Sequence, residues 1–220
     1  MGTVRIPSYR NRVGYHAGLL WAMAAICSAA LVMGYKATYH DIKQRQREDM
    51  QASLQQVIPS NLYDNDILAN KLDIAVDSKV MAGKDVIQVY RASKENRITA
   101  LAYQITGIGY AGPIEIMLGI NTEGKVLGTR VIAHSETPGL GDKIEIQRNN
   151  WIESFTGLSL GHPPVSKWKV KKDGGQFDQF TGATITPRGV VRAVKQGLEF
   201  FQQHKTELLQ INISTKADKS

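Results

Sequence analysis

The segment Asp178–Pro187 holds the residues whose types and order are best suited to chemistry. It reads DQFTGATITP, in which Thr186 has the side chain of a helix N-cap and Pro187 suits the first position of a helix. Thr184 would then lie just before a helix N-terminus, where free backbone N–H groups and the helix dipole favour an anion. The segment therefore predicts an anion site at the start of a helix, with Thr184 beside it.

Small residues directly before Thr184 are compatible with this hypothesis. Gly182 and Ala183 are small enough to let a phosphate come close to the backbone. The other interpretation is a strand-to-helix turn with an ordinary cap, and short motifs of this kind give many false matches. Taken alone, the tetrapeptide TGAT favours the ordinary turn.

A second segment, Ser135–Asp142, combines turn-forming residues with little side-chain bulk. Pro138 followed by Gly139 is typical of a type II turn, and Gly141 permits a further unusual backbone dihedral. Such a loop can lay its backbone against a planar ligand. The other interpretation is a connector between a strand and a helix, with Asp142 as the N-cap, and that is the default for this segment alone.

The elements that must position these two segments follow from hydropathy patterns. Alternating apolar runs predict two hairpins, with strands at Val86–Arg91, Ile98–Ile105, Ile114–Ile120 and Val126–Ala133. Helical spacing predicts helices at Asp142–Phe155 and Pro187–Gln203, and a short strand is expected at Ser166–Lys171. Antiparallel hairpins with helices inserted between them are typical of an α+β domain.

The N-terminal part of the chain is predicted to cross a membrane once. Ala17–Tyr35 carries no ionisable side chain apart from Cys27 and Tyr35, and about 20 apolar residues span the hydrocarbon core of a bilayer. A cleaved signal peptide and a buried core helix are the alternatives, but the apolar run continues past the small residues that resemble a cleavage site. Asp41–Val57 has helix-forming composition and is expected to extend the span as a stalk that Pro59 ends.

These patterns divide the chain into consecutive parts. We expect a short tail at residues 1–16, a transmembrane helix at 17–37, stalk and connecting helices at 38–84, the α+β domain at 85–208 and a flexible tail at 209–220. Lysine and arginine flank both ends of the span, so their distribution does not fix its orientation.

Composition excludes several classes of protein and of site. The 220 residues carry a formal net charge of +7, with 42% apolar and 21% charged residues, which indicates a globular chain and does not demand nucleic acid as a partner. The single Cys excludes a disulfide framework, a cysteine zinc site and an iron–sulfur cluster. The His residues show no metal-ligand spacing such as HExxH, and no GxSxG motif is present, so we expect neither a metal site nor a hydrolase.

Together, and in this order, the two segments resemble the motifs of a known flavoprotein family. SETPGLGDKI (Ser135–Ile144) and DQFTGATIT (Asp178–Thr186) are similar to motifs of a covalent flavin-binding domain, which the G subunit of the Rnf electron-transport complex shares with the C subunit of the sodium-pumping NADH:quinone reductase. Gly109–Ile114 resembles a third, weaker motif that precedes the central strand. The resemblance covers the span and nearly the whole domain, and the short region between them is more similar to the Rnf protein.

The resemblance implies a covalent cofactor and the residue that carries it. In this family the last Thr of the motif, here Thr184, holds FMN through a phosphoester after its Oγ attacks FAD and AMP leaves. Asp178 would be read by the flavin transferase that performs this attachment. Because the transferase works outside the cytoplasm, the resemblance implies a bacterial inner-membrane protein with a cytoplasmic N-terminal tail and a periplasmic flavin domain.

Further residues around the two motifs are candidates for contact with the flavin. The expected contacts are Glu136, Thr137, Leu140, Gly141, Thr181, Gly182 and Ala183. The side chains expected to neutralise the charge of the phosphate are those of Lys143, Lys169 and Arg188. His134 lies beside the turn and is included, although a His there is more often a structural hydrogen-bonding group. Trp151 and Trp168 are interpreted as core residues rather than as residues that stack on the flavin.

Three functions remain open at this point. The first is an electron carrier of an Rnf-type complex that works between ferredoxin and NAD and drives ion transport, with other membrane and peripheral subunits as partners. The second is the C subunit of a sodium-pumping NADH:quinone reductase, and the third is a membrane-anchored assembly module without a cofactor. In the first two, the flavin does the redox chemistry, and the protein supplies position and electrostatics. The carrier would not be catalytic alone.

Overall fold

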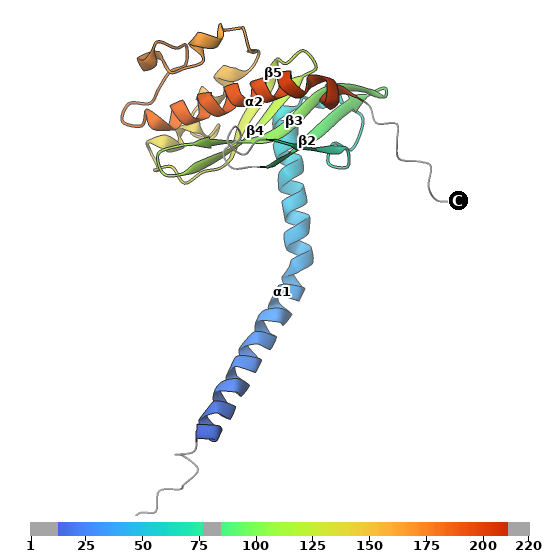
Figure 1. The fold of residues 1–220 in the computed structure, drawn as a ribbon, viewed down its shortest axis with the longest axis vertical. Helices are drawn as coiled ribbons and strands as arrows, with labels where there is room; N and C mark the ends of the chain where they lie inside the picture. Colours follow the sequence, from blue (N-terminus) through green and yellow to red (C-terminus); the bar gives the residue numbers. More distant parts are fainter. Residues whose placement is uncertain (1–12, 77–84, 211–220) are drawn as a thin grey trace, which may run out of the picture. The chain divides into compact units, whose positions relative to one another are not determined.

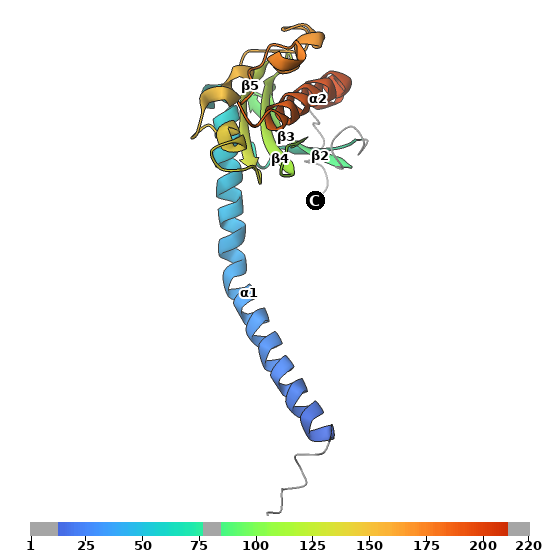
Figure 2. The same cartoon turned by 90° about the vertical axis from the view of Figure 1, so that its left-hand side faces the viewer.

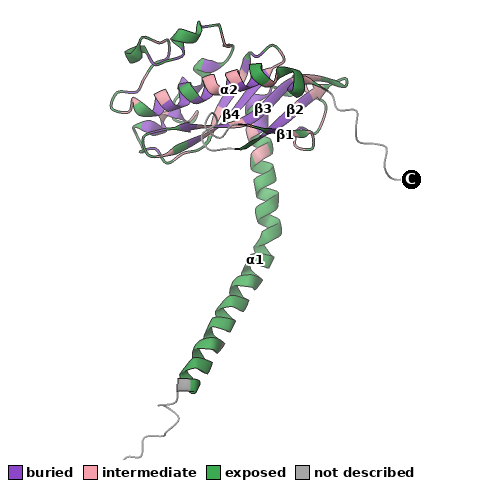
Figure 3. Ribbon diagram, in the orientation of Figure 1, coloured by how far each residue is buried: buried purple, intermediate pink, exposed green. Residues whose placement is uncertain are grey.

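Helix α1 (Val13–Val57) opens the part of the chain that the structure, a computed structural model, describes, which comprises residues 13–76 and 85–210. The predicted span and the predicted stalk form one unbroken helix. Its apolar stretch has a mean hydropathy of 1.9 and is exposed (Figure 3), so its length and composition suit a membrane crossing. The chain divides into two units, Met1–Asp49 and Met50–Ser220, and the last turns of α1 belong to the second.

An antiparallel sheet forms the centre of the second unit, with the strands in the order β1-β2-β3-β4-β5. The strands are β1 (Lys71–Ala75), β2 (Val86–Lys94), β3 (Arg97–Ile108), β4 (Pro113–Asn121) and β5 (Val126–Ala133). The predicted α+β class and the four strands predicted from alternating hydropathy are confirmed. Strand β1 goes beyond the prediction, because it pairs with β2 in the segment assigned to connecting helices. Leu72 and Ile74 alternate with Lys71, Asp73 and Ala75 as in a strand, but a run of five residues is a weak signal.

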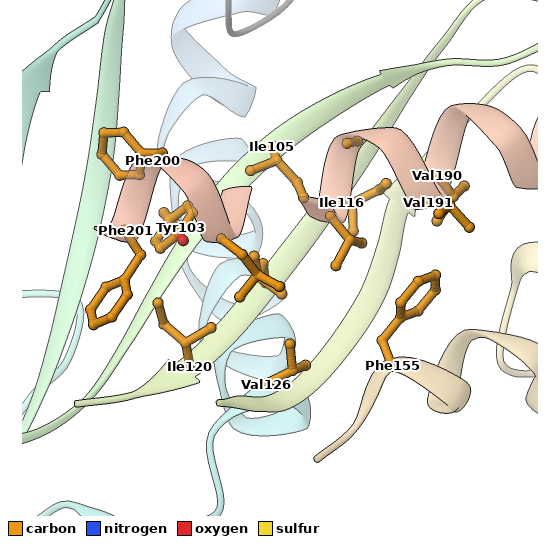
Figure 4. Packing of buried hydrophobic residues seen from close by; sticks show 14 of the residues in the cluster. Tyr103, Ile105, Ile116, Ile120, Val126, Phe155, Val190, Val191, Phe200 and Phe201 are labelled. Atoms are coloured by element: carbon orange, nitrogen blue, oxygen red, sulfur yellow. The ribbon is translucent and has the colours of Figure 1, made fainter. Parts of the chain in front are cut away.

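Helix α2 (Ile185–Leu209) covers one face of the sheet, as Figure 1 shows. Successive side chains of a strand point to opposite faces, so every second residue of β3 and β4 contributes to the layer under this helix, and Figure 4 shows Tyr103 and Ile105 there. The Tyr103 hydroxyl donates a hydrogen bond of 2.7 Å to the carbonyl oxygen of Gly197, which ties the helix to β3. This layer confirms the C-terminal helix that the sequence predicts.

The end of α1 covers the opposite face, so that the sheet lies between it and α2 (Figure 2). Leu54, Val57 and Ile58 are buried there against small alanines of β2 and β3. Gly119 and Gly128 face each other on β4 and β5, and a Cβ on Gly119 would lie 2.3 Å from the carbonyl oxygen of Val57. The absence of side chains on these two residues lets the helix backbone approach the sheet closely.

The predicted helix at Asp142–Phe155 is wrong, because the segment forms two short 3-10 helices, η3 (Gly141–Ile144) and η4 (Asn150–Phe155). Between them the chain is extended at Asn149, whose side chain accepts a hydrogen bond of 2.8 Å from the backbone N–H of Trp151. This bond caps a new helix N-terminus and therefore interrupts a continuous helix. Several apolar residues of the segment are nevertheless buried, which explains why their spacing resembles that of one helix.

The predicted strand at Ser166–Lys171 is also wrong, since the segment contains η5 (Val165–Lys167) and the start of η6 (Lys171–Asp173). Alternate residues within it are buried, and this alternation produces a strand-like pattern. The chain turns back tightly at this point, since a Cβ on Gly175 would lie 1.8 Å from the carbonyl oxygen of Lys169. An isolated bridge forms there instead.

The predicted tails lie mostly outside the described residues. Residues 13–16, which the sequence assigns to the N-terminal tail, belong to α1. Helix α2 ends at Leu209, next to the predicted end of the domain. The rest of both predicted tails, residues 1–12 and 211–220, is outside the described part of the chain.

Candidate functional site

Three loops meet around a cavity of about 270 Å³ at the N-terminal end of α2. They are the two segments singled out in the sequence and the loop that contains the weaker motif. The cavity is lined by Tyr110, Glu136, Thr137, Leu140, Gly141, Gly182, Ala183, Thr184, Ile185 and Thr186. Most of the predicted site residues are thus brought together, although they come from distant parts of the sequence.

Thr184 stands at the N-cap position of α2, so its predicted place just before a helix N-terminus is confirmed. Its side chain makes no capping hydrogen bond, and the N–H groups of the first helical turn have no intrahelical partners. Thr186 is not the N-cap that the sequence predicts, because it lies inside the helix and is buried. The helix dipole and the unpaired N–H groups therefore create a positive end beside the cavity.

One buried carboxylate joins the three loops. Glu136 is only 5% exposed; its Oε1 accepts a 2.9 Å hydrogen bond from the N–H of Ala111, and its Oε2 accepts one from the hydroxyl of Thr186. The N–H of Glu136 donates a 3.0 Å hydrogen bond to Nδ1 of His134, whose Nε2 lies 2.7 Å from Oε1 of Glu145. Because Nδ1 accepts, Nε2 carries the proton and donates to Glu145. Glu136 and His134 thus hold the loops in place by hydrogen bonding.

Two glycines leave the space that this carboxylate occupies. A Cβ on Gly109 would lie 2.3 Å from Oε1 of Glu136, and a Cβ on Gly141 would lie 2.7 Å from Oε2. Asp142 follows inside η3, so it is not the N-cap expected from the sequence; Leu140 holds that position. The second segment therefore turns tightly around Glu136 and presents its backbone and the Leu140 side chain to the cavity.

Several predicted contacts are not part of the cavity wall. The lining does not include Thr181, His134, Lys143, Lys169 and Arg188. Arg188 is engaged elsewhere, since its Nε and Nη2 each donate a 2.6 Å hydrogen bond to the carboxylate of Asp173. These bonds from Arg188 hold the pKa of the Asp173 carboxyl below its ordinary value. The positive end of α2, rather than an arginine or lysine side chain, is the cationic feature of the cavity wall.

Asp178 lies on the surface at the start of the TGAT segment. Its carboxylate pairs with Nζ of Lys171 at 2.6 Å, and its carbonyl oxygen accepts a 2.9 Å hydrogen bond from Nε1 of Trp151. It also borders an open recess of about 550 Å³, so it is accessible to another protein. Trp151 and Trp168 are both buried in the core, as predicted.

The sequence reasoning missed three residues of the cavity wall, namely Tyr110, Ile185 and Thr186. Tyr110 belongs to the weaker motif, so its position was marked, but no pattern shows that its side chain reaches the other two segments. Ile185 and Thr186 directly follow Thr184, and a helix predicted to begin two residues earlier would have drawn attention to them. The sequence motifs therefore contain all three residues, but their contacts with the cavity depend on how the loops fold together.

The arrangement is suited to an elongated ligand with an anionic end. The positive helix end next to Thr184 can hold a phosphate, while Tyr110, Leu140 and Ile185 provide apolar surface for a planar group. In the described part of the chain, no group of three or more His, Cys, Asp or Glu side chains is placed to hold a metal ion. The absence of a metal site stays a prediction.

Comparison with known proteins adds two findings. The FMN-binding domain family matches residues 109–199, which include all three cavity loops. The G subunit of the ion-translocating oxidoreductase complex from Stutzerimonas stutzeri is 45% identical over 201 residues, covering 91% of this chain and 86% of the relative. The protein of the same name from Vibrio cholerae is 44% identical over 193 residues, covering 87% of this chain and 91% of the relative.

Solved structures with a similar arrangement also exist. The C subunit of the Na⁺-translocating NADH-quinone reductase from Parabacteroides distasonis has a TM-score of 0.49 and 21% identity, covering 74% of this chain and 95% of that one. NqrC from Shewanella oneidensis has a TM-score of 0.47 and 22% identity, and the match covers 69% of this chain and 77% of that one. The sequence relatives carry the assignment, because their identity extends over most of both chains. This chain belongs to the family of G subunits of ion-translocating oxidoreductase complexes, and it contains an FMN-binding domain.

Proposed function

We propose that this chain is a membrane-anchored flavoprotein that relays electrons as one subunit of an Rnf-type, redox-driven ion-translocating complex working between ferredoxin and NAD. The observation that carries the proposal is the convergence of three family motifs on one cavity beside the unpaired N-terminal end of α2. The family assignment supports a complex with other subunits. The chain itself would not be catalytic alone, because its site holds a cofactor and offers no group for independent substrate chemistry.

Covalent attachment of FMN to Thr184 is the finer part of this proposal. In the transferase site, the Thr184 Oγ forms a bond to the FMN phosphorus of FAD, the pyrophosphate bond breaks, AMP leaves and the hydroxyl proton passes to a base. The Thr184 hydroxyl suits this role because it makes no capping bond within the helix. A phosphate on this oxygen would lie at the positive end of α2, where its charge is stabilised.

The rest of the cavity fits a flavin mononucleotide. Gly182 and Ala183 bring backbone close to the phosphate, and the apolar walls suit the faces of the ring. When bound, the flavin accepts and donates one or two electrons. Glu136 contributes by holding the three loops at fixed positions.

The orientation and partners follow from the same proposal. We place the N-terminal tail in the cytoplasm and the flavin domain in the periplasm of a bacterial inner membrane, where a flavin transferase reads the accessible Asp178 during maturation. The other partners are membrane and peripheral subunits of the complex, and none is a nucleic acid. Protease added to intact spheroplasts should degrade the domain if it lies in the periplasm. Protection of the domain would contradict this orientation.

The two alternatives make different predictions. The C subunit of a sodium-pumping NADH:quinone reductase would carry flavin in the same way but would co-purify with a quinone-reducing complex. A cofactor-free assembly module would carry no flavin at all. The sequence relatives favour the Rnf-type function, because the G-subunit relatives match over most of their length.

The test is flavin fluorescence in a denaturing gel, on full-length chain produced together with a flavin transferase. The wild-type band should be fluorescent and Thr184→Val should be dark, because valine keeps the shape of threonine and removes the hydroxyl. The matched control is Thr156→Val, which alters an exposed threonine at the end of η4, outside all three motifs, and should leave the band fluorescent. A dark wild-type band would favour the cofactor-free module.

A further inference from the structure

Tyr110 is an aromatic residue whose position the proposed function does not yet explain. Its side chain is 74% exposed, yet it lines the same cavity as Thr184. The tyrosines of the neighbouring strands, Tyr90 on β2 and Tyr103 on β3, are buried in the domain, and Tyr110 is not. The exposed ring of Tyr110 is therefore available to a ligand at the mouth of the cavity.

The loop that carries Tyr110 is held in a fixed shape. The N–H of Gly109 donates a 2.8 Å hydrogen bond to the carbonyl oxygen of Gly112, which closes a tight turn around Tyr110. The N–H of Ala111 donates its 2.9 Å bond to buried Glu136. Both neighbours of Tyr110 are thus anchored by backbone hydrogen bonds, so the exposure of the ring is a consequence of a restrained turn and not of a loose loop.

Two apolar side chains accompany this ring in the cavity wall. Leu140 is 43% exposed and Ile185 is 47% exposed, and they come from the other two loops. Gly182 lies beside Leu140, since a Cβ there would be 3.6 Å from a Leu140 methyl group. Aromatic and branched apolar surface around one opening is the lining that a flat, conjugated ring system prefers.

We infer that Tyr110 is the aromatic platform on which the flavin ring rests, with Leu140 and Ile185 as its apolar neighbours in the cavity wall. The inference rests on the proposed function, because it requires a flavin held at Thr184. Tyr110 then positions the ring and controls how much of it faces water. A ring held against a phenol also has a measurable signature, because the phenol donates an electron to the excited flavin, recovers it, and so quenches its fluorescence.

The experiment measures fluorescence per covalently bound flavin, on detergent-purified full-length chain produced together with a flavin transferase. Tyr110→Leu should raise the fluorescence several-fold and shift the flavin potential. Tyr110→Trp should keep the low fluorescence per flavin of the wild type, because an indole ring also stacks on the flavin and quenches it. Tyr110→Phe keeps a ring without the phenol, so its fluorescence should rise as well. The matched control is Tyr39→Leu, an exposed tyrosine of α1, which should leave the flavin unchanged.

The flavin content released after digestion separates the two levels of the proposal. A wild-type chain without covalent flavin would contradict the proposed function itself. Fully loaded Tyr110→Leu and Tyr110→Phe chains with wild-type fluorescence would overturn the role of Tyr110 and leave the proposed function standing. If Tyr110→Leu loads poorly, the comparison between the Phe and Trp variants decides, and equal fluorescence in both would overturn the inference.

Discussion

At the scale of single residues, Glu136 determines the shape of the candidate site. A buried carboxylate is costly unless it is hydrogen-bonded, and both oxygens of Glu136 accept a bond from a different loop. Its effect is to fix the distances between the TGAT loop, the SETPGLGD loop and the loop that carries Tyr110. The sequence predicted Glu136 as a flavin contact, which stays a prediction, and the structure adds this fixing role.

Removing the carboxylate should destabilise the domain. Glu136→Ala leaves the buried hydroxyl of Thr186 without its acceptor, at a cost of about 1–3 kcal/mol, and it also removes the acceptor of the Ala111 N–H, which water can reach because Ala111 is exposed. Glu136→Gln should cost less, because its amide oxygen can accept from Ala111 while its amide nitrogen donates to the Thr186 oxygen. Chemical denaturation of the full-length chain in detergent measures both changes. Equal stability of the Ala variant and the wild type would contradict the role of Glu136.

The ion pair between Asp173 and Arg188 gives a pH prediction. The Arg188 guanidinium lowers the pKa of the Asp173 carboxyl, and the carboxyl raises the pKa of Arg188. Because the folded-state pKa of Asp173 is depressed, the pair contributes above the ordinary carboxyl pKa, and that contribution is lost as pH falls through the lowered value. NMR titration of the Asp173 carboxyl carbon should give a pKa below 3.8, and Arg188→Gln should return it toward that value. An unchanged value in the variant would exclude Arg188 as the cause.

Residue roles were only partly predictable from the sequence. The place of Thr184 before a helix start was predicted because its neighbours specify that start, and that information is local, whereas its proposed role came from the resemblance of the two motifs. The contacts of Tyr110 depend on the return of a distant loop, and the partner of Arg188 depends on the turn at η6. Non-local contacts of this kind leave no period or spacing in the chain.

At the scale of elements, the contact between α2 and β3 sets the position of the site. Gly107 and Gly189 let the first turns of the helix touch the end of the strand, since a Cβ on Gly189 would lie 2.1 Å from the carbonyl oxygen of Ile108. Closer approach of the helix start brings Thr186 to the carboxylate of Glu136. The site is therefore built at the point where α2 begins.

Substitution of Gly189 by alanine tests this contact. Alanine favours a helix over glycine by about 1 kcal/mol, so an unhindered site would become more stable. At Gly189 the new methyl group would meet backbone, and we expect a net loss of stability of about 1–3 kcal/mol. Gly197→Ala is the comparison, because there the methyl group meets the end of the Leu118 side chain, which can move. Thermal denaturation should rank Gly189→Ala below Gly197→Ala, and the reverse order would contradict a rigid contact.

Elements with a regular pattern along the chain were predictable, and short irregular ones were not. In β3, large residues on the face toward α2 alternate with small alanines on the face toward the end of α1, because each face of the sheet meets a different helix. Among the 3-10 helices η3, η4, η5 and η6, only η4 begins at a side-chain cap, which Asn149 supplies, and the other three have no such cap. Their apolar residues are buried without a regular period, so hydropathy patterns there suggested a helix and a strand that do not exist.

At the scale of the whole molecule, the chain combines an anchor helix with a flavin-binding domain whose core includes the end of that helix. The domain unit begins at Met50, and Leu54, Val57 and Ile58 are buried in it. The sequence predicted the order of anchor, stalk and domain. It did not predict that the last turns of the stalk belong to the domain core, because the glycines that admit them lie on distant strands.

Truncation tests this division of the molecule. A chain that starts at Met50 should fold as a monomer in water, because it keeps the complete core of the domain. A chain that starts at Ser60 loses the burial of Leu54, Val57 and Ile58, each worth about 1.5–3 kcal/mol, which approaches the whole stability of a typical domain. Circular dichroism melts should show a cooperative transition only for the longer chain. Identical melts would exclude the end of α1 from the core.

The central claim is that Thr184 carries the flavin, and peptide mass spectrometry tests it most directly. Trypsin should release residues 173–188, a peptide that contains Thr181, Thr184 and Thr186. For chain produced with a flavin transferase, we expect this peptide to gain the mass of one FMN less one water, and fragmentation to assign the gain to Thr184. A flavin assigned to Thr181 or Thr186, or an unmodified peptide from a chain that received active transferase, would contradict the claim.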